Sequence, residues 1–198
     1  MLGIMLALSL VTAPTVEPLS TADAKLHLKI DGAGEDAYVD ALVKAARQLC
    51  EEYQQRRLIT QTWDWKLDEW PTALCGGRRE LSVPYPPLAS VTSITYLDAD
   101  GATQTWAAAS YQVDSTSEPG RIQPAYNETW PTIRSSILHP ITIRYVAGYG
   151  ASAASVPATT IQGLRKLLSH WHVNREPMGS VPDEVLALWN FERLVWLA

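Results

Sequence analysis

The stretch DAYVDALVKAARQLCEEYQQRR, residues 36–57, decides the fold class. Its apolar residues recur every third or fourth position, the spacing of one stripe on an α-helix. They are Tyr38, Leu42, Ala45, Ala46, Leu49 and Tyr53. The opposite face carries Asp40, Lys44, Arg47, Glu51 and Gln55. Arg47 and Glu51 are four residues apart and are placed to form an ion pair. A helix of about 20 residues is about 30 Å long, and one with a single apolar stripe needs packing partners.

Candidate partner helices lie on both sides of this stretch. Ser20 is a predicted N-cap for a short helix from Thr21 to about Leu28. A third helix is predicted to start at Pro157, a residue suited to the first turn, and a fourth covers residues 185–196. The fourth helix is apolar on more than one side, which one protomer has difficulty covering.

Between residues 58 and 147 the hydrophobic period changes from about 3.6 to 2, which predicts six or seven short strands. Trp63 and Trp65 alternate with polar residues, and the turn at residues 98–101 predicts a hairpin. The fold class is therefore α+β, with two N-terminal and two C-terminal helices packed as a small bundle and a mainly antiparallel β region inserted.

The predicted domain boundaries follow from this order: an extended N-terminal arm over residues 1–19, a helical bundle from 20–58 and 156–198, and an inserted β region over 59–155. The apolar run in MLGIMLALSLVTAP (1–14) has the length of a signal-peptide core. No Lys or Arg precedes it, however, and it is too short to span a membrane. We therefore expect an extended arm.

Composition narrows the function classes. The net charge is −5 and no basic run exceeds two residues, so a protein that grips nucleic acid through its phosphates is not expected. Eight Trp and eight Tyr against one Phe suggest either core filling or protein–protein contact. Cys50 and Cys75 have no metal-binding spacing, and Cys50 is expected to be a small buried apolar residue.

No set of catalytic or metal-binding residues is recognisable. His170 and His172 are two apart on a predicted helix and point to different faces, so they do not share a metal readily. GxSxG, HExxH and phosphate-binding glycine loops are absent from the sequence. The acids Asp64, Asp68 and Glu69 lie on a strand and its exit, the pattern of a solvated face. We expect no enzyme activity, metal or cofactor.

The chain resembles the head–tail connector, or adaptor, proteins of long-tailed bacteriophages over about residues 10–193. The resemblance rests on the order and spacing of short fragments: LVTAP (10–14), EPLS (17–20), EDAY (35–38), RLITQTW (57–63), PPL (86–88), SVTSI (90–94), YQVD (111–114), YVAGYG (145–150) and NRE (174–176).

The resemblance implies a structural virion protein at the head–tail interface, or neck, assembled in the host cytoplasm. Copies of such proteins form a ring, typically of twelve, below the portal protein. The ring extends the DNA channel without sequence-specific binding, and it docks the next neck or tail-completion component. No membrane partner is implied. The residues expected to contact the portal or a neighbouring subunit lie at the C-terminal end: Trp189, Phe191, Val195, Trp196 and Leu197.

Two other functions are compatible with parts of the sequence. The tryptophans of the β region suggest a module that binds carbohydrate or a host receptor; they are Trp63, Trp65, Trp70, Trp106 and Trp130. Sugar stacking needs exposed rings, whereas the alternation of Trp63 and Trp65 indicates that one face is core. The acids of the same region suggest a hydrolase only if a cleft brings two carboxylates together.

Overall fold

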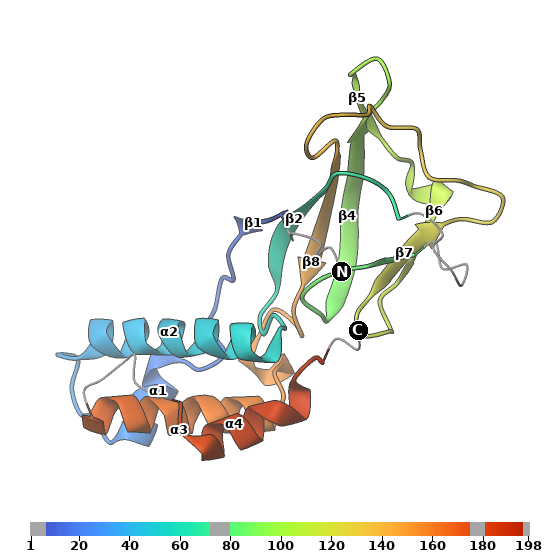
Figure 1. Cartoon of the computed structure of the whole chain (residues 1–198). Coiled ribbons are helices and arrows are strands. Elements are labelled where there is room, and N and C mark those ends of the chain that lie inside the picture. Colours follow the sequence, from blue (N-terminus) through green and yellow to red (C-terminus); the bar gives the residue numbers. More distant parts are fainter. Residues whose placement is uncertain (1–6, 72–79, 175–180, 196–198) are drawn as a thin grey trace. The chain divides into compact units, whose positions relative to one another are not determined.

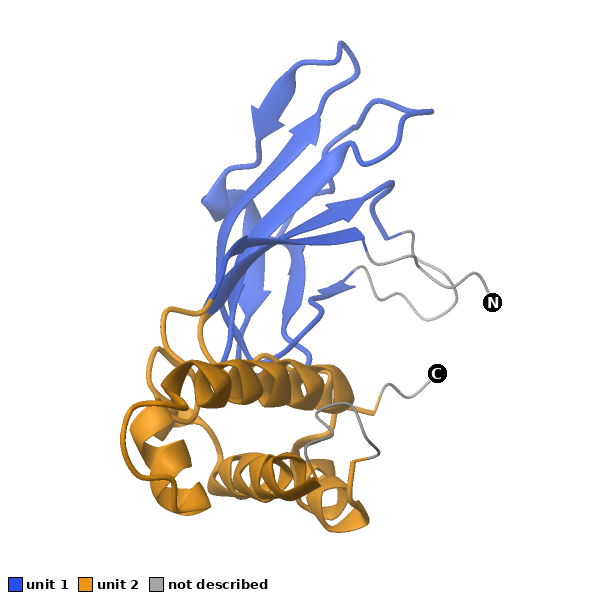
Figure 2. Cartoon of the chain, turned by 90° about the vertical axis from the view of Figure 1, so that its left-hand side faces the viewer, with its two compact units in different colours: residues 1–13, 61–148 blue, residues 14–60, 149–198 orange. Residues whose placement is uncertain are grey.

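A computed structural model of the chain describes residues 7–71, 80–174 and 181–195. The fold is α+β, as the sequence predicts, with four α-helices and two antiparallel sheets in these residues (Figure 1). The chain divides into two compact units (Figure 2). Residues 14–60 and 149–198 form the helical unit, and residues 1–13 and 61–148 form the β unit.

Four helices build the helical unit: α1 (Thr21–Leu28), α2 (Asp36–Gln54), α3 (Ala158–Asn174) and α4 (Asp183–Trp189). The predicted cap of α1 is confirmed, because the Ser20 hydroxyl oxygen accepts a hydrogen bond from the backbone N–H of Asp23 at 3.0 Å. Two short 3₁₀ turns, Ala153–Ser155 and Asn190–Glu192, precede α3 and follow α4.

The buried face of α2 differs from the predicted stripe. Tyr38 and Leu49 are exposed, whereas Val39, Val43 and Cys50 are buried. The predicted pair of Arg47 and Glu51 is confirmed at 2.9 Å between Nη1 and Oε2, but both residues are buried and not on a solvated face. The physical reason is that α2 carries two adjacent apolar stripes, and only its contacts with the other helices determine which stripe is covered.

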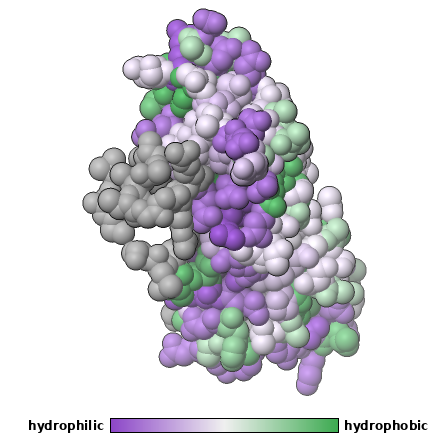
Figure 3. Space-filling view, turned by 90° about the vertical axis from the view of Figure 1, so that its right-hand side faces the viewer, coloured by the Kyte–Doolittle hydropathy of each residue, from purple (hydrophilic) through white to green (hydrophobic). Residues whose placement is uncertain are grey.

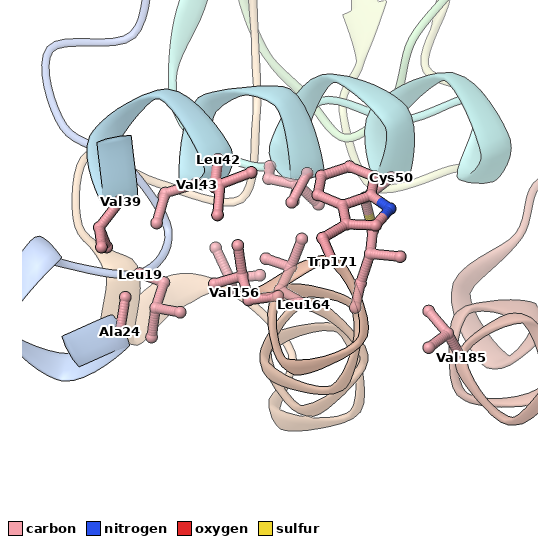
Figure 4. Close-up of a cluster of buried hydrophobic side chains, with 14 of the residues drawn as sticks. Leu19, Ala24, Val39, Leu42, Val43, Cys50, Val156, Leu164, Trp171 and Val185 are labelled. Atoms are coloured by element: carbon pink, nitrogen blue, oxygen red, sulfur yellow. The ribbon is translucent and has the colours of Figure 1, made fainter. Parts of the chain in front are cut away.

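The core of the helical unit lies between α2 and the helices facing it (Figure 4). Val39, Leu42 and Val43 of α2 share this core with Leu164 and Trp171 of α3, and Val39 lies on the side of Leu19 and Ala24 (Figure 4). The side chain of Cys50 lies in the same core, as predicted, and its thiol is free.

The larger sheet of the β unit has the strand order β1-β2-β8-β4-β5. Its strands are β1 (Ala7–Thr12), β2 (Gln61–Leu67), β8 (Ile141–Ala147), β4 (Leu88–Leu97) and β5 (Thr103–Thr105). All four pairings are antiparallel, and the predicted hairpin at residues 98–101 joins β4 to β5. β1 lies within the segment expected as an N-terminal arm and pairs with β2, Ala7 opposite Lys66 and Leu10 opposite Trp63.

The smaller sheet has the order β3-β7-β6, from β3 (Leu81–Ser82), β7 (Arg121–Pro124) and β6 (Tyr111–Asp114), with a 3₁₀ turn, Ala108–Ser110, before β6. Buried side chains from both sheets form one core, which includes Trp65, Ile94, Ile122, Ile143 and Tyr145.

Candidate assembly surface

The C-terminal segment of the helical unit is shorter as a helix than predicted. α4 ends at Trp189, and the prediction that helix continues to residue 196 is wrong. A 3₁₀ turn follows, and then the backbone N–H of Leu194 donates to the carbonyl oxygen of Gln54 at 3.0 Å. This bond to the end of α2 replaces the bond that would continue the helix, so the chain leaves α4 in an extended conformation.

Trp189 anchors this segment in the helical unit. Its side chain has 0% exposure, and its indole Nε1 donates to the carbonyl oxygen of Thr160 in α3 at 3.4 Å. Gly163 makes room for the ring, since a Cβ at this position would lie 2.3 Å from Nε1. The ring of Tyr53 from α2 packs beside the indole, with the ring centroids 6.0 Å apart. The structure thus places Trp189 in its own core, in place of the partner contact expected from the sequence.

The side-chain amide of Gln54 joins three helices at this point. Its Nε2 donates to the Thr160 hydroxyl at 3.1 Å and to the carbonyl oxygen of Trp189 at 3.0 Å. The residue is fully buried, so each of these bonds satisfies a group that water does not reach. The end of α2 is therefore fixed to α3 and to the last residue of α4.

Residues after Trp189 are held by further contacts with Tyr53 in α2, with Arg56 just after α2 and with Tyr149. Tyr53 donates its hydroxyl hydrogen to Asn190 Oδ1 at 2.7 Å, and the guanidinium of Arg193 lies 4.9 Å from the centroid of the same ring. Arg56 Nε donates to the carbonyl oxygen of Glu192. Tyr149 donates to the Glu192 carboxylate at 3.3 Å. The segment is thus attached to the bundle at several consecutive residues.

This attachment leaves two apolar side chains facing outward. Phe191 is 76% exposed and Val195 is 67% exposed. Trp196 and Leu197, also expected at a partner contact, lie outside the described residues. An exposed phenyl ring on a fixed segment adds apolar area to a contact with little loss of conformational entropy. Phe191 and Val195, which we call the C-terminal pair, are therefore the candidate assembly surface of the helical unit.

A largely buried ionic cluster lies elsewhere in the helical unit. Arg47 Nε lies 2.6 Å from Glu17 Oε2, and Arg47 Nη1 lies 2.9 Å from Glu51 Oε2. The other oxygen of Glu51 accepts the backbone N–H of Leu58 at 3.0 Å. The cluster connects the chain before α1, the middle of α2 and the chain beyond α2, with its charges paired as burial requires.

Sequence reasoning did not identify Gln54, Thr160 or Gly163 as supports of the C-terminal segment. One local signal was available, because an isolated glycine in a helix costs about 1 kcal/mol relative to alanine and is retained where something packs closely. The identity of that neighbour, Trp189, lies 26 positions away in the sequence and has no local signal.

The tryptophans of the β unit pack mainly against one another. Trp70 stacks on Trp130 with 4.7 Å between centroids, and Trp106 lies 5.2 Å from Trp130. Trp70 donates its indole hydrogen to the carbonyl oxygen of Pro131 at 2.9 Å. Trp65 is buried and Trp63 packs on Tyr85. These rings build the core, and they do not form the exposed platform that carbohydrate stacking needs.

Two of the three acidic residues considered for hydrolysis, Asp64 and Asp68, accept hydrogen bonds from β8 or the chain just before it. Asp64 binds Arg144 with two hydrogen bonds of 2.7 and 2.8 Å, from the cross-strand neighbour in β8. Asp68 accepts the backbone N–H of His139 at 2.7 Å. Within the described part of the chain no three His, Cys, Asp or Glu side chains come together as a metal site. Among the helices described there, none has the length and hydropathy needed to cross a bilayer.

Exposed apolar residues elsewhere are spread over several elements. On the face drawn in Figure 3, apolar residues lie scattered among polar ones. The most exposed are Leu26, Tyr126, Leu138 and Val173, from α1, the chain between β7 and β8, and α3. Isolated apolar residues of this kind are ordinary on protein surfaces. The C-terminal pair differs from them in placing two strongly exposed apolar side chains only four residues apart in the sequence.

The chain is similar over nearly its whole length to chains in solved particle structures. In the neck of an empty gene transfer agent particle computed with C6 symmetry, the similar chain is 25% identical, with a TM-score of 0.80 over 96% of this chain and 97% of that chain. In the neck of the native particle computed with C12 symmetry, the similar chain is 26% identical, with a TM-score of 0.73 over 96% of this chain and 97% of that chain. In the virion of the native particle, the similar chain is 24% identical, with a TM-score of 0.75 over 97% of this chain and 97% of that chain. No model of a known protein family matches the sequence, and no curated protein does.

Proposed function

We propose that this chain is a structural protein of a virion neck, a head–tail adaptor whose copies form a ring below the portal protein. The observation that carries the proposal is its similarity, over 96% of its length, to chains in particle necks. The similarity extends over nearly all of both chains, so the fold is shared as a whole and not only as a common helical bundle.

The ring we propose has twelve copies and extends the DNA channel. The C6 and C12 symmetries of the similar necks support a closed ring of identical chains. The net charge of −5 suits a wall past which DNA moves, because it provides little excess positive charge to hold phosphates. The proposed partners are neighbouring copies, the portal protein and a downstream neck or tail-completion protein. The proposed location is the virion neck, after assembly in the host cytoplasm.

The proposed role is structural and not enzymatic. Asp64, the acid best placed on a strand for catalysis, is held in a two-bond ion pair with Arg144. Asp68 accepts a hydrogen bond from the backbone N–H of His139. Paired in this way, neither carboxylate is arranged as half of a general acid–base pair.

The C-terminal pair provides the contact with the portal or with a neighbouring subunit in this proposal. Trp189 acts as the internal anchor, and Phe191 and Val195 are the groups presented outward. Trp196 and Leu197, which follow directly, extend the proposed contact. Aromatic side chains at the centre of an interface carry most of its binding free energy, so Phe191 is expected to contribute most.

The experiment compares particles assembled with the wild-type chain and with a Phe191→Ser, Val195→Ser double variant. Both side chains are exposed, so the free energy of unfolding is expected to change by less than about 0.5 kcal/mol per site. Incorporation into particles, measured by quantitative immunoblot, is expected to fall at least about tenfold.

The matched control is a Leu26→Ser, Val173→Ser double variant, which removes two equally exposed apolar side chains from the same unit. It is expected to be incorporated at the wild-type level. Wild-type incorporation of the Phe191→Ser, Val195→Ser variant would overturn the assigned contact. Absence of the wild-type chain from purified particles would overturn the proposed function itself.

A further inference from the structure

In the described residues, the outer edge of the larger sheet carries few of the features that normally prevent edge strands from pairing. β1 has the sequence ALSLVT, with no charged residue and no proline. Natural sheets protect their edges with lysine, proline, bulges or covering segments. Leu10 is 47% exposed and Val11 is 43% exposed. The register with β2 is regular from Ala7 to Leu10, and a shift occurs only between Leu10 and Thr12.

The opposite edge of the same sheet is a short strand that likewise lacks charge and proline. β5 consists of Thr103, Gln104 and Thr105, and all three side chains are exposed. It contains no charge and no proline. Among the described strands, β4 is the only one that pairs with β5, and β2 is the only one that pairs with β1. In the part of the chain that the structure describes, this sheet therefore has one strand without a second partner at each end.

The two edges have compatible directions. Four antiparallel steps separate β1 from β5 in the order β1-β2-β8-β4-β5, so the two strands run the same way. In a closed ring each copy is related to the next by a modest rotation, which nearly preserves strand direction. β5 of one copy is thus oriented to run parallel to β1 of the next, a pairing that backbone hydrogen bonds can support.

We propose that β1 pairs with β5 of a second copy, so that the larger sheet continues from subunit to subunit. This inference rests on the proposed function, which makes a copy of the same chain the neighbour on each side. A ring needs two different complementary surfaces on every protomer, and two ends of one sheet supply them. Pairing of β1 with β1 would instead bury one edge in a closed dimer and could not continue into a ring.

The test is cross-linking between single cysteines in assembled particles. In a Cys75→Ser background, Ser9→Cys and Thr105→Cys place one thiol on each edge; both positions are exposed, and Cys50 is buried. A short bismaleimide is expected to yield a ladder of dimers, trimers and larger species only when both cysteines are present. Either single variant should stay monomeric.

The cross-linking pattern distinguishes failure of the β1–β5 pairing from failure of the proposed function. A ladder limited to dimers in the Ser9→Cys variant alone would indicate β1–β1 pairing and overturn the inference. Particles that hold the chain at the wild-type level but give no ladder would overturn it as well, while leaving the proposed function intact. Particles without the chain would overturn the proposed function.

An edge variant gives an independent measurement. Val11→Lys adds a charge to the free edge, so ring formation in the full-length protein, measured by cross-linked multimers per chain, is expected to fall about tenfold. Val173→Lys, at an exposed site on α3, is the matched control and is expected to leave multimers unchanged. Circular dichroism establishes that both variants are folded. Equal multimer yields for Val11→Lys and wild type would contradict the proposal.

Discussion

The indole of Trp189 fills the space that a side chain at Gly163 of α3 would occupy. A Cβ on Gly163 would lie 2.3 Å from indole Nε1 and 2.6 Å from Cδ1. Trp189 is rigid, fully buried and bonded to Thr160, so it has little freedom to retreat. The absence of a side chain at position 163 is what lets the C-terminal segment attach to α3.

Gly163→Ala is therefore expected to lower the free energy of unfolding by about 1–3 kcal/mol, even though alanine is the better helix former. Chemical denaturation followed by far-UV circular dichroism measures the change. Gly34→Ala is the control, since a Cβ there meets nothing within 4 Å. A stabilised Gly163→Ala protein would show that the ring of Trp189 is free to move aside.

Arg47→Met is expected to destabilise the chain by about 3–5 kcal/mol, because it removes the guanidinium that pairs with both Glu17 and the buried Glu51 carboxylate. Lys166→Met removes the cation of an exposed pair with Glu184 and is expected to cost less than about 1 kcal/mol. Denaturant midpoints and slopes for both variants give the comparison. Losses of equal size would contradict the assigned burial of the Arg47 cluster.

Cys50 is expected to react slowly with thiol reagents. Burial raises its pKa well above the ordinary value, and the negative charge of Glu51 adds to the effect. The thiolate is the reactive form, so in a Cys75→Ser chain at pH 8 the rate with Ellman's reagent should be at least about a hundredfold lower than in guanidinium. Similar rates in the folded and unfolded chains would place Cys50 at the surface.

Asp114 is expected to make the β unit sensitive to acid. The Ser117 hydroxyl, Arg121 and the backbone N–H groups of Ser117 and Thr116 hold its pKa well below the ordinary 3.8. As pH falls through that ordinary value, the unfolded chain binds a proton that the folded chain does not, so stability present at higher pH is lost. Denaturant midpoints at pH 5 and pH 3 should differ less in Asp114→Asn than in wild type.

Ser117→Ala provides the direct check on the cause of that depressed pKa. It removes the hydrogen bond from the Ser117 hydroxyl, 2.6 Å from Asp114 Oδ2, and should raise the pKa of Asp114 toward its ordinary value. A carboxyl-carbon NMR titration of both proteins measures the difference. An unchanged pKa would show that Arg121 and the backbone N–H groups are sufficient alone.

The sequence alone predicted the elements whose signals are local. Ser20 caps α1 because its hydroxyl reaches an N–H three residues away, and the hairpin between β4 and β5 follows from the turn residues Asp98 and Gly101. The period-2 alternation around Trp63 and Trp65 identified β2 for the same reason: each pattern is set by the backbone geometry of a few neighbouring residues.

The C-terminal site was predicted only in part. Sequence reasoning found an apolar segment and five candidate contact residues, but it treated Trp189 and Phe191 alike. The structure separates them, with Trp189 buried and Phe191 exposed. The separation depends on where α4 ends. Beyond that end, the backbone N–H of Leu194 donates a hydrogen bond to the carbonyl oxygen of Gln54, a residue 140 positions earlier in the sequence.

What the sequence by itself determined is that residues 36–54 are helical, that a β region follows, and that the fold is α+β. Only the tertiary structure decided that α2 buries Val39 and Val43 in place of Tyr38 and Leu49, and that β1 lies at the edge of a sheet beside β2. Periodicity reports which residues share a face. Which of two apolar faces is covered, and which strands meet, depends on contacts between distant segments that no local pattern encodes.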